Sequence, residues 1–191
     1  DVKQFERSVT VKGLSEREYD ADIVIWPIQF TGADNNLESL YHSIDGNTQR
    51  IRTFLVENGV HSEAITFSIP AITDKSAQQY GGSARPEFRY TALQTVTVYS
   101  NDIESVLGVM SSLFELGKQG IVFTGGDYQS QTEYLFTRLN EVKPEMVEEA
   151  TRKAREVAEK FASDSNSELG KIKKASQGQF SISQIQPNQE S

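Results

Sequence analysis

Two histidines and a pair of closely spaced aspartates are the residues whose types could support metal or acid–base chemistry. His42 and His61 are the only histidines, and neither has a second histidine or an acidic residue at the spacing of a zinc motif such as HExxH. We therefore interpret both as surface or structural histidines. A metal site would require carboxylates that are distant in the sequence to converge on one of them.

Carboxylates occur in two patterns that deserve comparison with acid–base sites. Asp20 and Asp22 lie two residues apart on a predicted strand, so they should share one of its faces. Paired carboxylates act as acid and base when burial separates their pKa values, but a solvated start of the strand is the interpretation that we favour. Glu145, Glu148 and Glu149 are expected in the first turns of a helix, where the helix dipole stabilises negative charge without an active site.

Several kinds of chemistry are excluded by residue type. The sequence contains no cysteine, which excludes thiol catalysis, disulfides and cysteine-ligated zinc in this chain. The glycine pairs at 81–82 and 125–126 match neither GxGxxG nor a phosphate-binding loop, and no GxSxG occurs. A short basic patch is interpreted as protection of a strand edge: Lys171, Lys173 and Lys174. We predict no catalytic residue, no cofactor, no metal and no enzymatic turnover.

Composition limits the class of protein and its partners. The chain has 191 residues, of which 37% are hydrophobic and 24% charged, as expected for a folded chain with a packed core. Its 19 basic and 27 acidic residues give a net charge of −8, which argues against nucleic acid as a partner. The longest apolar run, at 23–28, is too short to span a membrane. Because the chain begins with Asp1, we expect earlier processing, such as removal of a signal peptide, or trimming.

Hydrophobic periodicity predicts three helices, each with one apolar stripe, separated by strands. The fold class is therefore α+β: a mainly antiparallel sheet with three helices on one face, in a βαββαβ-like (ferredoxin-like) core plus an additional β-α-β unit. Asn36 and Asp102 are expected to cap helices, Gly46 to kink the first helix and Gly59 to end it. The predicted helices are 37–55, 103–114 and 144–162, and the strands are 9–11, 19–30, 64–72, 88–99, 121–123, 133–139 and 169–182.

The third predicted helix has the clearest pattern. Pro144 suits a first helical position, where its missing N–H costs nothing. Small side chains at every fourth position should let this helix lie close to the sheet: Ala150, Ala154, Ala158 and Ala162. We therefore expect Ala154→Leu to destabilise the protein by roughly 1–3 kcal/mol through overpacking. Aromatic side chains of the long strand are expected in the core rather than in a ligand platform: Tyr19, Trp26 and Phe30.

Residues 74–87 are polar and rich in glycine, serine and glutamine, which predicts a mobile hairpin loop. Tyr80, Arg85 and Phe88 make this segment a possible interaction loop, because aromatic and arginine side chains are enriched at protein interfaces. Deleting residues 78–84 is then expected to leave the monomer folded and to lower the mass of the oligomer.

Several segments resemble the SIMPL domain, or DUF541, family. They are VTVKG at 9–13 followed by Ala21 and Asp22, LVENGV at 55–60, and the stretch 136–180 with its FTRLNEVKPEM, ATRKAR and LGKI pieces. The last three pieces are specific together and weak singly. On this resemblance we predict a single SIMPL-like domain at 8–182, with flexible termini at 1–7 and 183–191. Similar members continue into a basic, valine-rich strand, whereas this chain runs from Ile182 into SQIQPNQES.

The stretch 136–180 resembles the bacterial envelope branch closely, and the family resemblance implies a secreted, periplasmic or membrane-associated protein. Members are linked to oxidative-stress tolerance and to surface antigens, and some assemble into ring-like homo-oligomers. The family implies no catalytic residue. We therefore expect a non-enzymatic envelope protein that acts by self-association or by binding envelope proteins, with a link to oxidative-stress tolerance. The alternative is a small-molecule-binding protein or an enzyme with a pocket of dispersed polar residues.

Overall fold

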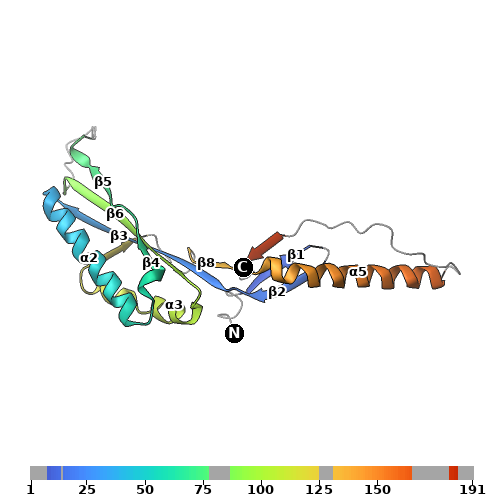
Figure 1. Ribbon diagram of the computed structural model, residues 1–191. Coiled ribbons are helices and arrows are strands. Elements are labelled where there is room, and N and C mark those ends of the chain that lie inside the picture. The colour runs from blue at the N-terminus through green and yellow to red at the C-terminus, as the bar shows by residue number, and fades with distance from the viewer. Residues whose placement is uncertain (1–7, 14, 78–86, 125–130, 165–180, 185–191) are drawn as a thin grey trace, which may run out of the picture. The chain divides into compact units, whose positions relative to one another are not determined.

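The computed structural model describes residues 8–13, 15–77, 87–124, 131–164 and 181–184. The chain divides into two compact units (Figure 1). Unit 1 comprises Asp1–Asp22 and Tyr134–Ser191, and unit 2 comprises Ile23–Glu133.

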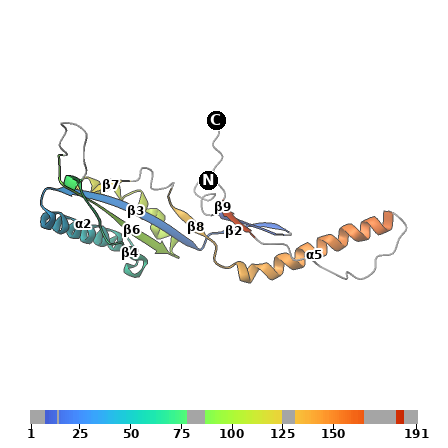
Figure 2. The same cartoon turned by 90° about the horizontal axis from the view of Figure 1, so that it is seen from above.

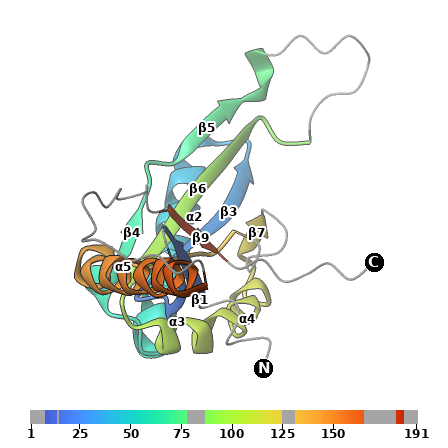
Figure 3. The ribbon, with the colours of Figure 1, turned by 90° about the vertical axis from the view of Figure 1, so that its right-hand side faces the viewer.

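Unit 2 is built on two long antiparallel strands. β3 (Ile23–Asp34) pairs with β6 (Tyr90–Ser100) in a continuous register from Val24 opposite Ser100 to Asp34 opposite Tyr90. β4 (Ile65–Phe67) and β5 (Ala71–Asp74) pair with the other side of β6, and β7 (Val122–Thr124) pairs with β3. Figure 3 shows β5, β6 and β3 side by side.

The helices of unit 2 cover one face of this sheet. α2 (Leu37–Glu57) and α3 (Ile103–Met110) both pack on β3 and β6, and α2 runs along the sheet in Figure 2. A single turn, α4 (Phe114–Gly117), follows α3, and short 3₁₀ turns lie at Ser62–Ala64 and Lys75–Ala77. Fully buried side chains fill the space between helices and sheet: Val24, Trp26, Ile28, Leu40, Ile51, Leu55, Val96, Val98 and Val106.

The ends of α2 follow the sequence closely. Asn36 is its N-cap, and the Asn36 side chain accepts a hydrogen bond from the Ser39 backbone N–H at 2.9 Å. Gly59, just beyond the helix, has φ +101°, a conformation that favours glycine. The helix is not interrupted at Gly46, where a kink was expected. Burial of Ile44 and Ile51 on either side holds the helix continuous against a glycine penalty of about 1 kcal/mol.

One polar side chain is buried beneath α2. Gln94 on β6 is 6% exposed, and both ends of its amide are paired. Thr48 on α2 donates to Gln94 Oε1 at 3.0 Å, and Gln94 Nε2 donates to the Ser68 carbonyl at 2.7 Å. The amide therefore links the helix, the central strand and the connection between β4 and β5.

Unit 1 contains a small antiparallel sheet and the longest helix. The strand order is β2-β1-β9, with β1 at Ser8–Lys12, β2 at Glu16–Asp20 and β9 at Ser181–Gln184. α5 (Leu139–Asp164) is preceded in the chain by β8 (Glu133–Leu135), a strand of the six-stranded sheet that contains β3. Buried apolar side chains of unit 1 come from β1, from the residue after β2, from the chain around β8 and from α5: Val9, Val11, Ala21, Tyr134, Phe136, Val142, Met146 and Ala162.

The α+β class and the mostly antiparallel pairing are confirmed, but the strands form two sheets rather than one. The strand expected at 19–30 is divided at Ala21 and Asp22 into β2 and β3. The third helix lies in unit 1, whereas α2 and α3 pack on the sheet of unit 2. β9 reaches Gln184, so Ser183 and Gln184 of the predicted flexible C-terminal stretch belong to a strand.

The strand expected at 64–72 is also divided. Ile65 is buried as predicted, but Ile69, expected on the same face, is 90% exposed. The chain leaves the ladder at Ser68, whose hydroxyl accepts a hydrogen bond from the Thr95 backbone N–H. Pro70, which has no N–H to donate, follows before pairing resumes at Ala71.

Helix α5 differs from its prediction in start and in contact. It begins at Leu139, so Pro144 lies inside the helix rather than at its first position. Burial of Val142 favours the earlier start. Ala154 is exposed, so the alanine line is not a close helix–sheet contact, although Ala162 is buried. Within the described residues, no helix is both long and apolar enough to cross a membrane.

Candidate functional site: an uncharged sheet face

The two histidines are placed on the surface of unit 2 and lie on different elements. His42 is exposed on α2, and His61 is exposed just before the 3₁₀ turn at Ser62–Ala64. The pKa of Asp102 is lowered, mainly by hydrogen bonds from Ser105 and to a smaller degree by the charge of His61. Among the described residues, no group of three histidine or acidic side chains is positioned to hold a metal ion.

The two aspartates considered for acid–base chemistry do not share a strand face. Asp20 ends β2, whereas Asp22 lies between strands and has a structural contact. Its carboxylate accepts hydrogen bonds from the Thr137 backbone N–H at 3.1 Å and from the Thr137 hydroxyl at 2.9 Å. Asp22 therefore fixes the chain just before α5, and the two carboxylates do not lie together on one strand face as their spacing predicted.

Glu145, Glu148 and Glu149 lie beyond the first turn of α5, because the helix begins at Leu139, earlier than expected. Glu149 pairs with Arg17 on β2 and with Lys153 one turn further along, the latter at 3.0 Å. Lys153, and then Arg17, lower the pKa of Glu149. Glu145 is 3.5 Å from Arg17. These contacts tie α5 to the sheet of unit 1, and they are structural.

Two shallow hollows open on the surface of unit 2. One, of about 280 Å³, lies between α2 and α4 and includes Arg50, Phe54 and Leu116. The other, of about 290 Å³, includes His61, Glu63 and Tyr99. Both are broadly open to solvent. Neither resembles the enclosed, largely apolar site that a small molecule needs.

The predicted interaction loop lies largely outside the described residues, as do the glycine pairs and the basic patch near 171–174. Tyr80 and Arg85 belong to the undescribed stretch, and Phe88 is 39% exposed beside it. The described residues that flank the segment are held together by side-chain contacts. Arg89 contacts both oxygens of Asp74 at 3.2 Å, and its guanidinium lies 4.8 Å from the centre of the Tyr90 ring.

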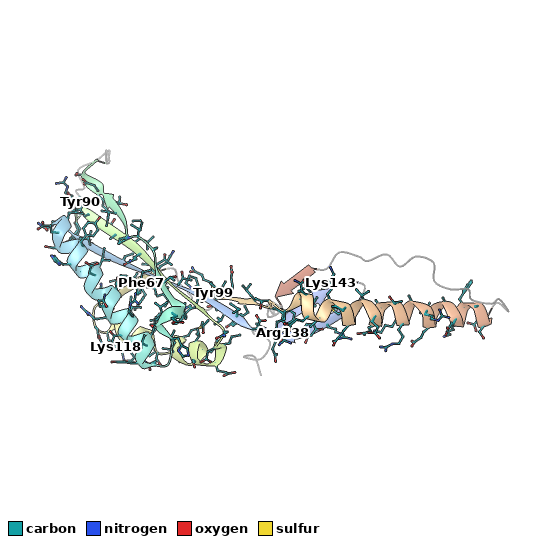
Figure 4. The ribbon with its side chains drawn as sticks, viewed as in Figure 1. Phe67, Tyr90, Tyr99, Lys118, Arg138 and Lys143 are labelled. Atoms are coloured by element: carbon teal, nitrogen blue, oxygen red, sulfur yellow. The ribbon has the colours of Figure 1, made fainter. Side chains whose placement is uncertain are left out.

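The face of the unit 2 sheet opposite α2 and α3 is a broad surface of strand residues. Strand alternation and the pairing registers of β3, β4, β5, β6 and β7 place sixteen side chains on it, and none of them is buried. Tyr99 and Val122 are 51% and 57% exposed, and Figure 4 shows Tyr99 on the side away from the helices. The set is Ile23, Ile25, Pro27, Gln29, Thr31, Ala33, Thr66, Ala71, Thr73, Thr91, Leu93, Thr95, Thr97, Tyr99, Val122 and Thr124.

None of these sixteen side chains is charged, although 24% of the whole chain is charged. We call this surface the open sheet face. Seven of the sixteen positions are threonines, whose methyl and hydroxyl groups offer both apolar contact and hydrogen bonding. An antiparallel sheet with one solvated face normally carries polar and charged residues there. An uncharged face of this extent is instead typical of the centre of a protein interface.

The chain matches, over residues 9–191, the family described as SIMPL: Protein of unknown function (DUF541). The chain belongs to the SIMPL family. The match runs through both units of this SIMPL protein. No curated protein matches the SIMPL chain at a significant level.

The open sheet face was not among the sites predicted from the sequence. In β6, Thr95, Thr97 and Tyr99 alternate with the buried valines, a pattern that by itself indicates only a strand with one exposed side. The signal was present in the sequence, because both long strands lack charged residues at every outward position. Trp26 and Phe30 are in the core as expected, and Tyr19 stacks on Phe136 in unit 1 with ring centres 4.8 Å apart.

Proposed function

We propose that this SIMPL protein is a non-enzymatic protein of the bacterial envelope that acts by self-association. The observation that carries the proposal is the location of its exposed apolar side chains. Eleven large apolar side chains of the described residues are more than a third exposed, and of these Tyr99 alone lines either hollow. Apolar groups displayed on open surfaces suit contact between proteins, whereas small-molecule sites gather them in a cavity.

The envelope location and a contribution to oxidative-stress tolerance belong to this proposal through the resemblance to bacterial envelope members. Protection would then be indirect, because the chain has two methionines and no cysteine. Met146 is fully buried, so it is a poor scavenger. Stabilising an assembly in the envelope would provide protection without turnover.

The test of self-association is the solution mass of the purified chain, measured by light scattering over a range of concentrations. One chain has a mass of 21.3 kDa, so a defined multiple of this mass is expected. A mass of 21.3 kDa at every concentration would overturn the proposal.

A second measurement tests the absence of turnover. Purified protein is incubated with hydrogen peroxide, and the peroxide concentration is followed with time. We expect a loss limited to about two equivalents per chain, matching its two methionines. A sustained loss far beyond this would show catalysis and contradict the non-enzymatic role.

A further inference from the structure

We propose that the open sheet face is the surface through which two copies of this chain pair, sheet against sheet, about a two-fold axis. The inference rests on the proposed self-association and specifies where it occurs. Its occupant is a second copy of the same face, so each copy contributes the same set of side chains.

Charge is the first argument for a second copy. The chain carries a net charge of −8, so contact between most of its surfaces would bring like charges together. None of the sixteen side chains that define the open sheet face is charged, and pairing these side chains with a second copy of the same set avoids this repulsion at the contact. A partner with a charged surface would instead bury charges that have no counter-charge on this face, which is costly.

Area is the second argument. The eleven residues of β6 give the face a length of roughly 37 Å, and three strand spacings from β4 to β7 give a width of roughly 14 Å. Each copy therefore offers roughly 500 Å² in projection, and the relief of its side chains adds to this. Two copies reach the roughly 1,000 Å² of total buried surface that a specific interface needs.

The composition of the face suits close packing of two sheets. Sheets that pack face to face lie about 10 Å apart, with interdigitated side chains. The central row of the face contains Pro27, Thr97 and Thr66, which are opposite one another in the pairing registers. These are compact side chains without long flexible stems, so ordering them at a contact costs little entropy.

The strand edges offer a weaker alternative for pairing. β2 is an outer strand of unit 1, and its sequence is EREYD. Four of its five residues are charged, and charges on an edge strand oppose the addition of another strand. The face is therefore a better contact than this edge.

The test introduces one charge at the centre of the face. Thr97→Glu should reduce the solution mass to about half of the wild-type value or less, because two buried carboxylates would meet like charge and lose their water. Thr53→Glu is the matched control, since it adds the same charge at an exposed position of α2, on the opposite side of the sheet. We expect this control to keep the wild-type mass. Emission from Trp26, the only tryptophan, checks that unit 2 is folded in both variants.

A second measurement keeps the proposal testable if Thr97→Glu does not fold. The chain has no cysteine, so Thr97→Cys creates a unique thiol with little change in size. A bis-maleimide that spans about 10 Å should join two Thr97→Cys chains, because paired sheets have this separation. Thr53→Cys should remain a single chain under the same conditions.

The outcomes separate the pairing surface from self-association itself. If the wild type assembles but Thr97→Glu folds and keeps the full mass, the pairing through this face is wrong and self-association stands. Failure of Thr97→Cys to cross-link within an intact assembly would contradict the pairing in the same way. A monomeric wild type overturns both.

Discussion

Asp74, at the end of β5, has the most strongly perturbed carboxylate among the residues described. It accepts four hydrogen bonds, two from Arg89 and two from the backbone and hydroxyl of Ser76. The contact with Arg89 is the main reason why the pKa of Asp74 falls from 3.8 to about 2. The group remains partly exposed, so it fixes local geometry more than it stabilises the whole fold.

The first prediction concerns this titration. Because the pKa of Asp74 is lower in the folded chain than in the unfolded chain, its contribution to stability is present above about pH 4 and lost as the pH falls through about 2. Carboxyl NMR titration should show a midpoint near 2 for Asp74, and Arg89→Gln should move it toward 3.8. An unchanged midpoint in Arg89→Gln would show that Ser76 alone holds the carboxylate charged.

The second prediction compares Gly46, which lies inside α2, with Gly59, which lies just beyond the end of this helix. Gly59 has φ +101°, so Gly59→Ala should destabilise unit 2 by about 1–2 kcal/mol. Gly46 lies inside the helix, with no atom within 4 Å of the added methyl group. Gly46→Ala should therefore stabilise by about 0.5–1 kcal/mol. Urea melts followed by Trp26 emission measure both, and equal effects of the two substitutions would refute this account.

At the scale of elements, α5 illustrates the limit of periodicity as evidence. Its alanine spacing predicts a buried line, yet Ala154 is exposed and Val157 is 70% exposed. The first half of the helix is held by other means, through buried Met146 and the pair between Glu149 and Arg17. Periodicity indicates which side chains share a face of the helix, but it does not reveal how far along the helix the neighbouring sheet extends.

The third prediction follows from this difference within one helix. Ala154→Leu should change the free energy of unfolding by less than about 0.5 kcal/mol, because it adds a side chain at an exposed site. Met146→Ala should cost about 2–5 kcal/mol, because Met146 is fully buried. Urea denaturation followed by far-ultraviolet circular dichroism measures both. A large loss of stability in Ala154→Leu would instead indicate that Ala154 lies in the close helix–sheet contact that the alanine spacing predicts.

The elements were predictable where local patterns are strong. Asn36 and Asp102 cap helices as expected, and β6 follows its alternation. The breaks were harder to predict, because they depend on contacts between distant residues. Asp22 bonds Thr137, and Ser68 bonds Thr95; both contacts end or interrupt strands whose hydrophobic patterns continue. Each of the two long strands shows its uncharged outward positions in the sequence, but only the pairing of β3 with β6 joins them into one face.

At the scale of the whole molecule, the proposed pair brings together two chains that each carry −8 charge through a neutral contact. Added salt then screens the repulsion between charges of the two chains that lie outside the contact. The contact itself contains no salt bridge that salt could weaken.

The fourth prediction is that pairing strengthens, or stays unchanged, as salt rises. Sedimentation at sodium chloride concentrations from about 20 mM to about 500 mM, where the screening length falls severalfold, measures the dimer fraction. Thr53→Glu, with one more negative charge per chain, should respond in the same direction. A dimer fraction that falls with salt would indicate ion pairs across the interface and would contradict a neutral contact.

The buried amide of Gln94 has a consequence for how the chain avoids misfolding. β6 alternates threonine and valine beside Gln94, so a slip of two residues against β3 would keep similar side chains on each face of the sheet. Such a slip would move Gln94 away from Thr48 and Ser68 and leave a buried amide unpaired, at a cost of about 1–3 kcal/mol. Gln94 therefore helps to specify the strand register, because the slipped sheet is less stable than the native one. A Gln94→Leu chain would lose that discrimination and would be expected to populate slipped, aggregation-prone forms during refolding.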